Sequence, residues 1–337
     1  MRPSPIAPYR PSPIVHYDFQ FMKGVGVQTN SDRITIPAKA LLLLILIALA
    51  FGSGWPLMKL GVIELPVLTF RWMTAILSGV GILALAAIMG HKVKLHRQEI
   101  RIALICALFN VTGWFYFSGL GLTMLSAGRA TILAYTHPLF TFVIAYAIGR
   151  DRLTAARLFA LFCGMCMVIV LSAQDFQAFG ESPFGVLAML SGAACFAIGA
   201  NLQKRTWHTP SFVLAGWQML LGGIPLLMLA PIFDQNPFTE FTLLGASAVA
   251  YTVLIGNMIG FVLWIKVLEM VPAPIATIGL LPVPMVGIIS GVVILHENVG
   301  WQEAAALLLI TTALASTLNL SSNVKNQDTS APIPPKN

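Results

Sequence analysis

Charge is scarce in this chain, because only 10% of its 337 residues are Asp, Glu, Lys or Arg while 57% are apolar. Soluble domains carry charge on roughly a quarter of their residues, so the composition excludes an ordinary soluble protein. Uncharged runs such as Ala40 to Met58 and Leu104 to Leu125 are long. About 20 apolar residues at ~1.5 Å each cross a hydrocarbon core of ~30 Å. The sequence therefore predicts an integral membrane protein.

Motifs for catalysis and for nucleotide-driven pumping are also missing. The sequence contains neither a Gly-x-Ser-x-Gly nucleophile motif nor a Gly-x-x-x-x-Gly-Lys-Ser/Thr loop. Cys163-Gly-Met-Cys166 lies in a predicted span and lacks the surroundings of a redox motif, so we interpret it as helix packing. None of the 13 acidic residues falls at the middle of a predicted span, where coupled pumps usually carry a carboxylate. We expect no enzyme activity, no metal and no cofactor.

The apolar runs predict an all-α polytopic fold with ten transmembrane helices. The first run continues through Phe51–Trp55 without a cleavage site, so a signal peptide is not expected. The predicted spans are 39–60, 66–90, 100–122, 126–148, 153–172, 183–204, 211–232, 241–266, 272–295 and 301–320.

The two halves of the chain resemble each other when the sequence is compared with itself. At one fixed offset, the matches are Met124, Ala127, Ala130, Thr131, Ile132, Pro138, Asp151 and Leu161 with Met270, Ala273, Ala276, Thr277, Ile278, Pro284, Glu297 and Leu307. With a one-residue slip, Phe51, Gly54, Lys59 and Trp72 match Phe196, Gly199, Lys204 and Trp217. The sequence thus predicts two five-helix repeats over 38–172 and 183–320, an arrangement common in carriers with a midplane site.

Lys and Arg gather in alternate loops, which sets the expected orientation. The basic residues are Lys92, Lys94, Arg97, Arg101, Arg150, Arg152, Arg157, Lys204 and Arg205, whereas Asp175, Glu181, Asp234 and Glu240 mark the other loops. Both termini are therefore predicted in the cytoplasm, with the protein in the inner (plasma) membrane. Because five spans are an odd number, the second repeat would be inverted relative to the first. The loops also explain the net charge of +7 without a nucleic-acid partner.

Two polar tails flank the predicted spans. Residues 1–37 are rich in proline and residues 321–337 are polar, so both are predicted to be disordered. The N-terminal tail would be a binding arm for a partner, or Met22 rather than Met1 would be the biological start. Both interpretations stay open.

Ionisable residues inside the predicted spans are candidate site residues. Arg71 lies on the outer side of the second span, where it would contact solute or form a structural ion pair with Glu64. Arg129 is nearer a helix end, where snorkelling to the membrane surface is the favoured interpretation and a site role is the alternative. His137 precedes Pro138 in mid-span, and a proline there opens the helix toward a cavity. Pro282 and Pro284 are the equivalent helix breaks in the second half.

Aromatic and amide side chains complete the predicted substrate-binding set. Its members are Trp55, Arg71, Trp72, Asn110, Tyr116, Tyr135, His137, Gln218 and Asn257. Interfacial anchoring is the common alternative for Trp and Tyr, and bonding between helices is the alternative for the amides.

These features resemble the drug/metabolite transporter superfamily, and within it the EamA-type permeases, over residues 39–320. The matching features are Arg71 after the Pro-led start of the second span, Pro138, Pro284, Gly149-Arg-Asp-Arg-Leu153 and His296-Glu-Asn-Val299. The family usually has a Gly-Glu pair in each of the last two segments. In this chain, Arg150 separates Gly149 from Asp151 in the first segment, and no glycine precedes Glu297 in the second. The resemblance implies a secondary carrier, in many members an exporter of amino acids, related metabolites or amphipathic toxic compounds, with a central cavity and rocking halves.

We therefore predict a carrier of small organic solutes such as amino acids. A deep cation without deep acids favours a solute with an anionic group, and aromatic side chains favour an aromatic or amphipathic body. The alternatives are a multidrug efflux carrier, a membrane enzyme or lipid scramblase, and a non-transporting scaffold that recruits partners. Direction of transport, coupling to protons through His137 and a homodimer stay open.

Overall fold

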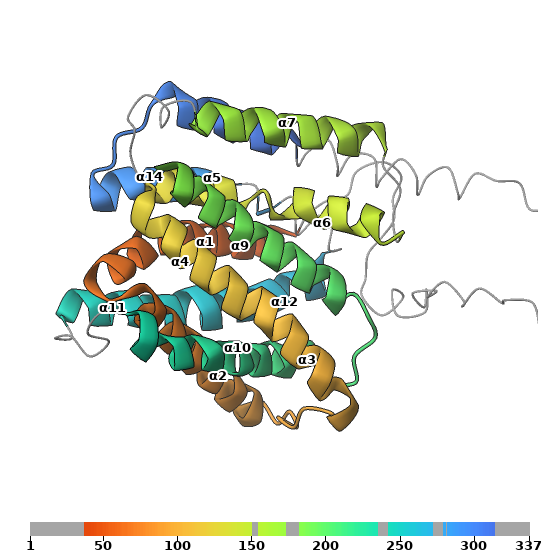
Figure 1. Ribbon diagram of the computed structural model, residues 1–337. Helices are drawn as coiled ribbons and strands as arrows, with labels where there is room; N and C mark the ends of the chain where they lie inside the picture. The colour runs from red at the N-terminus through yellow and green to blue at the C-terminus, as the bar shows by residue number, and fades with distance from the viewer. Residues whose placement is uncertain are drawn as a thin grey trace, which may run out of the picture. The chain divides into compact units, whose positions relative to one another are not determined.

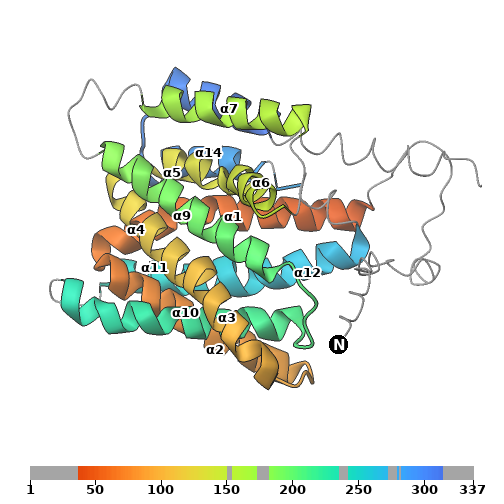
Figure 2. The same ribbon diagram turned by 45° about the vertical axis from the view of Figure 1, so that its right-hand side comes forward.

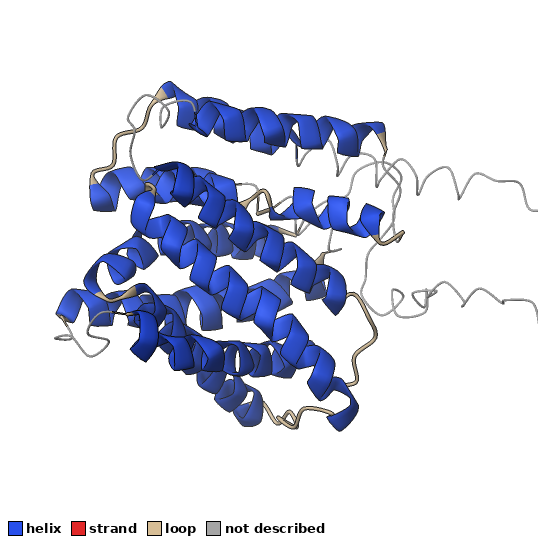
Figure 3. Cartoon of the chain, viewed as in Figure 1, coloured by secondary structure: helices blue, strands red, loops and turns tan. Residues whose placement is uncertain are grey.

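The structure is a computed structural model that describes residues 37–149, 154–172, 182–234, 242–271, 279–280 and 282–313. Within these ranges every regular element is helical (Figure 3). The elements are α1 (Ala38–Glu64), α2 (Val67–Ile88), η2 (Arg97–Glu99), α3 (Ile100–Ala107), η3 (Leu108–Gly113), α4 (Trp114–Met124), α5 (Ala127–Ala134), α6 (His137–Ala147), α7 (Ala155–Ser172), α9 (Ser182–Gln203), α10 (Ser211–Phe233), α11 (Leu243–Tyr251), η4 (Thr252–Ile259), α12 (Gly260–Met270) and α14 (Val283–Leu295). A further helix covers 301–313. Except for Pro37, the predicted tails lie outside the described residues, and so do residues 150–153 and 272–278.

Seven helical stretches among the described residues are long and apolar enough to cross a bilayer. They are Ala38–Glu64, Val67–Ile88, Arg97–Met124, Ala127–Ala147, Pro183–Gln203, Ser211–Phe233 and Leu243–Met270. They correspond to seven of the ten predicted spans. The predicted spans 153–172, 272–295 and 301–320 are represented by shorter described helices, each next to residues outside the description.

Short, sharply defined turns separate consecutive helices. Leu65 is extended (φ −124°, ψ 145°) between α1 and Pro66, as expected for a residue before proline, and Pro66 then precedes α2. Ser126 begins α5, where its hydroxyl accepts a hydrogen bond from Arg129 N (3.3 Å). His296 ends α14 in the left-handed conformation, with φ of 54°. The turns at Leu65 and Ser126 reverse the chain within two residues and place the next helix beside the last.

Helices of the first half of the chain pack mainly against helices of the second half. α2 lies beside α10 in both views (Figures 1 and 2). α1 packs on α11, α12 and α14, whereas α9 packs on α3, η3, α4, α5 and α6. Small residues bring α2 and α10 together, since a Cβ atom added to Gly79 would lie 2.8 Å from Leu220 N. Neither half therefore forms a separate bundle.

Hydrogen bonds between turns define the two ends of the bundle. At the Glu99 end, the Glu99 carboxylate accepts bonds from Thr209 N (3.1 Å) and Thr209 Oγ1 (2.6 Å), and the rings of His96 and His208 stack 5.2 Å apart. At the opposite end, named here the Glu297 end, Thr242 Oγ1 donates to Glu64. At each end, these bonds join a residue of the first half to a residue of the second half.

Asp234 adds a further link at the Glu297 end. Its carboxylate accepts hydrogen bonds from Thr69 N (2.7 Å) and Thr69 Oγ1 (2.8 Å) in the first turn of α2. A carboxylate favours the partial positive charge of a helix N-terminus, so Asp234 from the end of α10 caps α2.

Candidate solute-binding cavity

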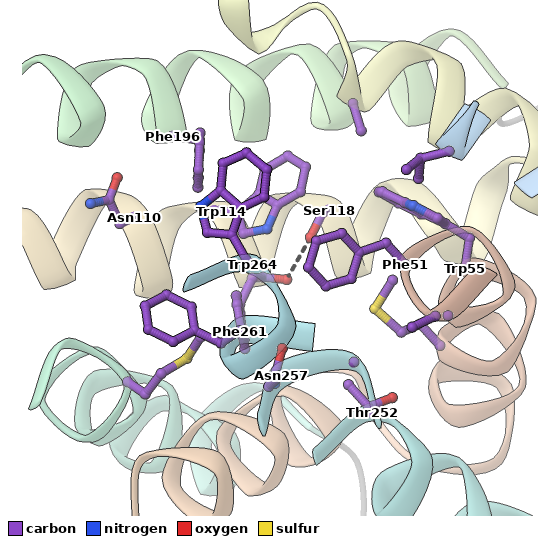
Figure 4. A pocket seen from close by; sticks show the side chains of 18 of the residues that line it. Phe51, Trp55, Asn110, Trp114, Ser118, Phe196, Thr252, Asn257, Phe261 and Trp264 are labelled. Carbon is purple, nitrogen blue, oxygen red and sulfur yellow. Dashed lines mark hydrogen bonds between the residues drawn. The ribbon is translucent and has the colours of Figure 1, made fainter. Parts of the chain in front are cut away.

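A cavity of about 440 Å³ lies among helices of both halves. Its walls come from α1, α2, η3, α4, α9, α10, η4, α12, α14 and the chain around the break between α5 and α6. Figure 4 shows the side chains from these elements gathered around it. The volume falls within the ~300–1,000 Å³ that small-molecule sites typically occupy. The cavity is thus the candidate binding site.

A chain of aromatic rings forms one wall of the cavity. Trp55 meets Trp114 edge-on with centroids 6.3 Å apart, and Trp114 meets Phe196 at 5.7 Å. Phe196 then meets the His137 ring at 5.0 Å, and His137 meets Tyr135 at 6.0 Å. Edge-to-face contacts of this kind hold rings in fixed orientations. The wall therefore offers a preformed apolar surface to a planar or amphipathic molecule.

Arg71 brings a buried cation to the same cavity. The residue is only 2% exposed, and its NH2 group donates to Ser118 Oγ (3.2 Å) while NH1 points at Met58 Sδ (3.5 Å). Its Nε is buried without a hydrogen-bond partner. Phe115 lies 5.5 Å from the guanidinium carbon in a cation–π contact. Among the described residues, no carboxylate pairs with Arg71.

Two π-helical segments interrupt the third and eighth predicted spans at the cavity. η3 carries Asn110, whose Nδ2 donates to Gln203 Oε1 (2.9 Å) and Gln218 Oε1 (3.3 Å). η4 carries Asn257, whose Nδ2 donates to Ser78 Oγ (2.8 Å). A π-helix has one extra residue per turn and is frequent at functional sites. Each π-helical segment thus places one asparagine side chain in the cavity wall, and that side chain is hydrogen-bonded to a residue of the other half.

The fourth predicted span is broken where the sequence indicated. α5 ends at Ala134, and α6 begins at His137 with Pro138 in its first turn. His137 Nδ1 donates to the Ala134 carbonyl oxygen (2.9 Å), which would otherwise lack a helical partner. In the second half, Pro282 precedes α14 and Pro284 lies in its first turn.

The structure brings most of the predicted site residues together. Those that line the cavity are Trp55, Arg71, Asn110, Tyr135, His137 and Asn257. Gln218 is 5% exposed and reaches the cavity only through Asn110. Trp72 and Tyr116 pack instead on a core cluster formed by residues such as Phe115 and Leu226.

The ion pair between Arg71 and Glu64, one of the two alternatives for Arg71, is not found, because Glu64 bonds Thr242 and Arg71 bonds Ser118. Arg129, for which snorkelling was the favoured interpretation, instead pairs with Glu303, with Nε 2.7 Å from Oε1.

Several cavity residues were absent from the predicted set. Ser118 and Thr252 are polar members, and Thr252 Oγ1 is buried without a partner. Nothing local in the sequence marks them. Phe51 and Phe196 both line the cavity, and their match in the sequence repeat was a signal that could have found them.

Among the described residues, no group of three or more His, Cys, Asp or Glu side chains is arranged to hold a metal ion. The four cysteines are free thiols.

Comparison with protein families decides the class of this bundle. The model of the EamA-like transporter family matches twice, at residues 38–173 and at residues 183–319. The chain belongs to the EamA-like transporter family. The expected resemblance to EamA-type permeases is confirmed, and the two matches cover the two halves separately.

Individual relatives agree with this membership. The chain is 24% identical over 274 residues to the "uncharacterized transporter YoaV" of Bacillus subtilis (strain 168), which covers 81% of this chain and 94% of the relative. It is 27% identical over 278 residues to the "uncharacterized transporter YdeK" of the same organism, covering 80% and 93%. It is also 23% identical over 264 residues to the "uncharacterized inner membrane transporter YedA" of Escherichia coli (strain K12), covering 78% and 85%.

A crystal structure with 18% sequence identity has the same fold, with a TM-score of 0.62 over 86% of this chain and 99% of that chain. Together with the apolar helices, the family makes this EamA-like protein a multi-pass membrane transporter of a small-molecule solute.

Proposed function

We propose that this protein is a secondary carrier, in the export direction, of small organic solutes that bear a carboxylate, such as amino acids or related metabolites. The observation that supports the proposal is that Arg71 is buried in the cavity wall without a described carboxylate partner. A buried ion costs several kcal/mol in lost hydration, and a guanidinium with one hydroxyl and one thioether partner recovers little of that cost. A solute carboxylate would supply the missing charge through paired N–H···O bonds.

The rest of the cavity favours an apolar or aromatic solute body. The ring wall from Trp55 to Tyr135 supplies flat contact area, and Asn257 with Thr252 supplies polar groups on another side. An efflux carrier for cationic drugs would need a carboxylate in the cavity. Among the described residues that line it, none is acidic and one is cationic. The observations therefore favour anionic or zwitterionic solutes over cations.

Alternating access of two inverted five-helix repeats, together making ten spans, is the proposed mechanism. One support is that the family model matches each half of the chain separately. Another is that α1 contacts helices of the second half while α9 contacts helices of the first half. Because α2 and α10 lie side by side, the halves would rock about that contact. Lys92, Lys94 and Lys204 are at the Glu99 end, so we assign this end to the cytoplasm.

Counterflow in proteoliposomes tests the proposal. Vesicles holding purified protein are preloaded with unlabelled amino acids, and the uptake of labelled amino acids is followed. We expect accumulation in the parent and its loss in Arg71→Ala. Arg101→Ala is the matched control, because it removes the same charge from an exposed position outside the cavity. Equal accumulation in Arg71→Ala and Arg101→Ala would contradict the role of Arg71. No accumulation in the parent, with correctly inserted protein, would remove amino acids as the solute.

A further inference from the structure

We propose that Lys59 and Glu297 form the gate that closes the cavity at the Glu297 end. The proposal rests on the carrier function above. Lys59, near the end of α1, donates to Glu297 Oε1 (3.1 Å) and to the Leu125 carbonyl oxygen (2.8 Å). The same Glu297 oxygen accepts a bond from Ala127 N (2.7 Å), and Gly128 N lies 3.4 Å from Oε2. Two side chains thus tie together three separate parts of the chain.

The three parts that meet at this pair all continue into the cavity wall. α1 lines the cavity up to Met58, the residue before Lys59. α4, which ends just before Leu125, lines it at Ser118, and α14, which ends just before Glu297, lines it at Val283. Loss of the pair would remove the side-chain bonds that tie α1 to the other two at this end. A gate needs a contact of this kind, in which bonds at the end of the bundle join helices that also line the cavity.

The environment of the pair suits a contact that forms and breaks. The side chains of Lys59 and Glu297 are 20% and 12% exposed, so water screens their attraction less than at an open surface. By contrast, the pair between Lys266 and Glu269 lies within α12, and its side chains are 53% and 56% exposed. Glu297 also faces the N-terminus of α5, where the backbone amides of Ala127 and Gly128 point at its carboxylate. The pair is thus shielded from most of the solvent, while both side chains keep some contact with water.

The gate is linked to the cavity cation through α1. Arg71 NH1 contacts Met58 Sδ (3.5 Å), and Met58 adjoins Lys59 in the same helical turn. A carboxylate bound to Arg71 would compete with Met58 and Ser118 for the guanidinium. Release of Met58 would free the adjacent turn of α1 to shift, and with it the lysine of the gate. Lys59 and Glu297 are thus positioning residues for transport and do not bind the solute.

Cysteine labelling tests the gate without any solute. The reporter is Gly54→Cys, because Gly54 lines the cavity and an added Cβ would meet no described atom within 4 Å. The four native cysteines are replaced by Ala, and intact cells are treated with a membrane-impermeant maleimide. We expect slow labelling in this parent and at least a tenfold faster rate when Lys59→Met is added. Lys266→Met is the matched control and leaves the rate unchanged.

A second variant covers the case in which Lys59→Met fails to fold. Glu297→Gln removes the ion pair but keeps an oxygen for Ala127 N, and we expect faster labelling there too. Fast labelling in the parent, or an unchanged rate in both gate variants, overturns the gate. Because the assay needs no solute, failure of the gate is distinguishable from failure of the counterflow experiment.

Discussion

Replacing Arg71 by Met separates a guanidinium that binds solute from one that stabilises the fold. In the absence of solute, the change removes the bond to Ser118 Oγ, worth about 1.5–3 kcal/mol because its donor is charged, and the weak contact with Met58 Sδ. It also removes a buried charge whose lost hydration costs several kcal/mol. Among the described residues, no carboxylate is left unpaired by the change. We therefore expect the thermal midpoint of the detergent-solubilised variant to equal or exceed that of the parent.

Arg129→Met is the matched comparison. Arg129 Nε lies 2.7 Å from Glu303 Oε1, and the two side chains are 14% and 5% exposed. Removing this arginine leaves a largely buried carboxylate without that partner, which typically costs about 3–5 kcal/mol. Intrinsic tryptophan fluorescence during heating measures both variants. A drop in midpoint for Arg71→Met as large as that for Arg129→Met would refute the assignment of Arg71 to solute binding.

Added solute gives the second half of the same experiment. A ligand at about 100 times its Kd stabilises the folded state by about 2.7 kcal/mol. The parent should show this gain with a transported carboxylate, and Arg71→Met should show none. A full gain in the variant would likewise contradict the assignment.

Two further predictions concern helix packing, and both are measured by the same thermal midpoint. Gly79→Ala should destabilise the protein by about 1–3 kcal/mol, because its Cβ would lie 2.7 Å from Leu220 Cγ at the contact of α2 with α10. Gly54→Ala is the control, because the space around Gly54 is open, and it should be neutral or stabilising. Equal midpoints for Gly79→Ala and Gly54→Ala would contradict the close contact at Gly79. Asp234→Ala should cost about 1 kcal/mol by removing the cap on Thr69 N, whereas Asp234→Asn keeps an acceptor and should lose less.

Local patterns explain why much of the fold was predictable. A long uncharged run has to form a helix in a bilayer, because its backbone polar groups can bond only within the segment. The first span was accordingly predicted at 39–60, and α1 covers Ala38–Glu64. Pro138 likewise acts on its own neighbours, and the break between α5 and α6 lies beside it.

The partners of the charged side chains could not be read from sequence spacing. Glu64 is close to Arg71 along the chain, yet its carboxylate bonds Thr242 from the other half. Ser118 and Met58, which contact Arg71, are marked by no motif. The packing of α1 and α2 against distant helices decides these contacts.

The sequence by itself determined that this is a helical membrane protein with two similar halves, because apolar length and internal repetition are properties of segments and do not depend on tertiary contacts. Comparison of the same sequence with the EamA-like family identifies it as a transporter. The sequence also brought forward six of the polar and aromatic residues that line the cavity. Only the tertiary structure decided that Arg71 lacks a described carboxylate partner and that Lys59 meets Glu297. Which charges are paired and which are left for a solute depends on how two distant halves of the chain pack together, and no local pattern records that packing.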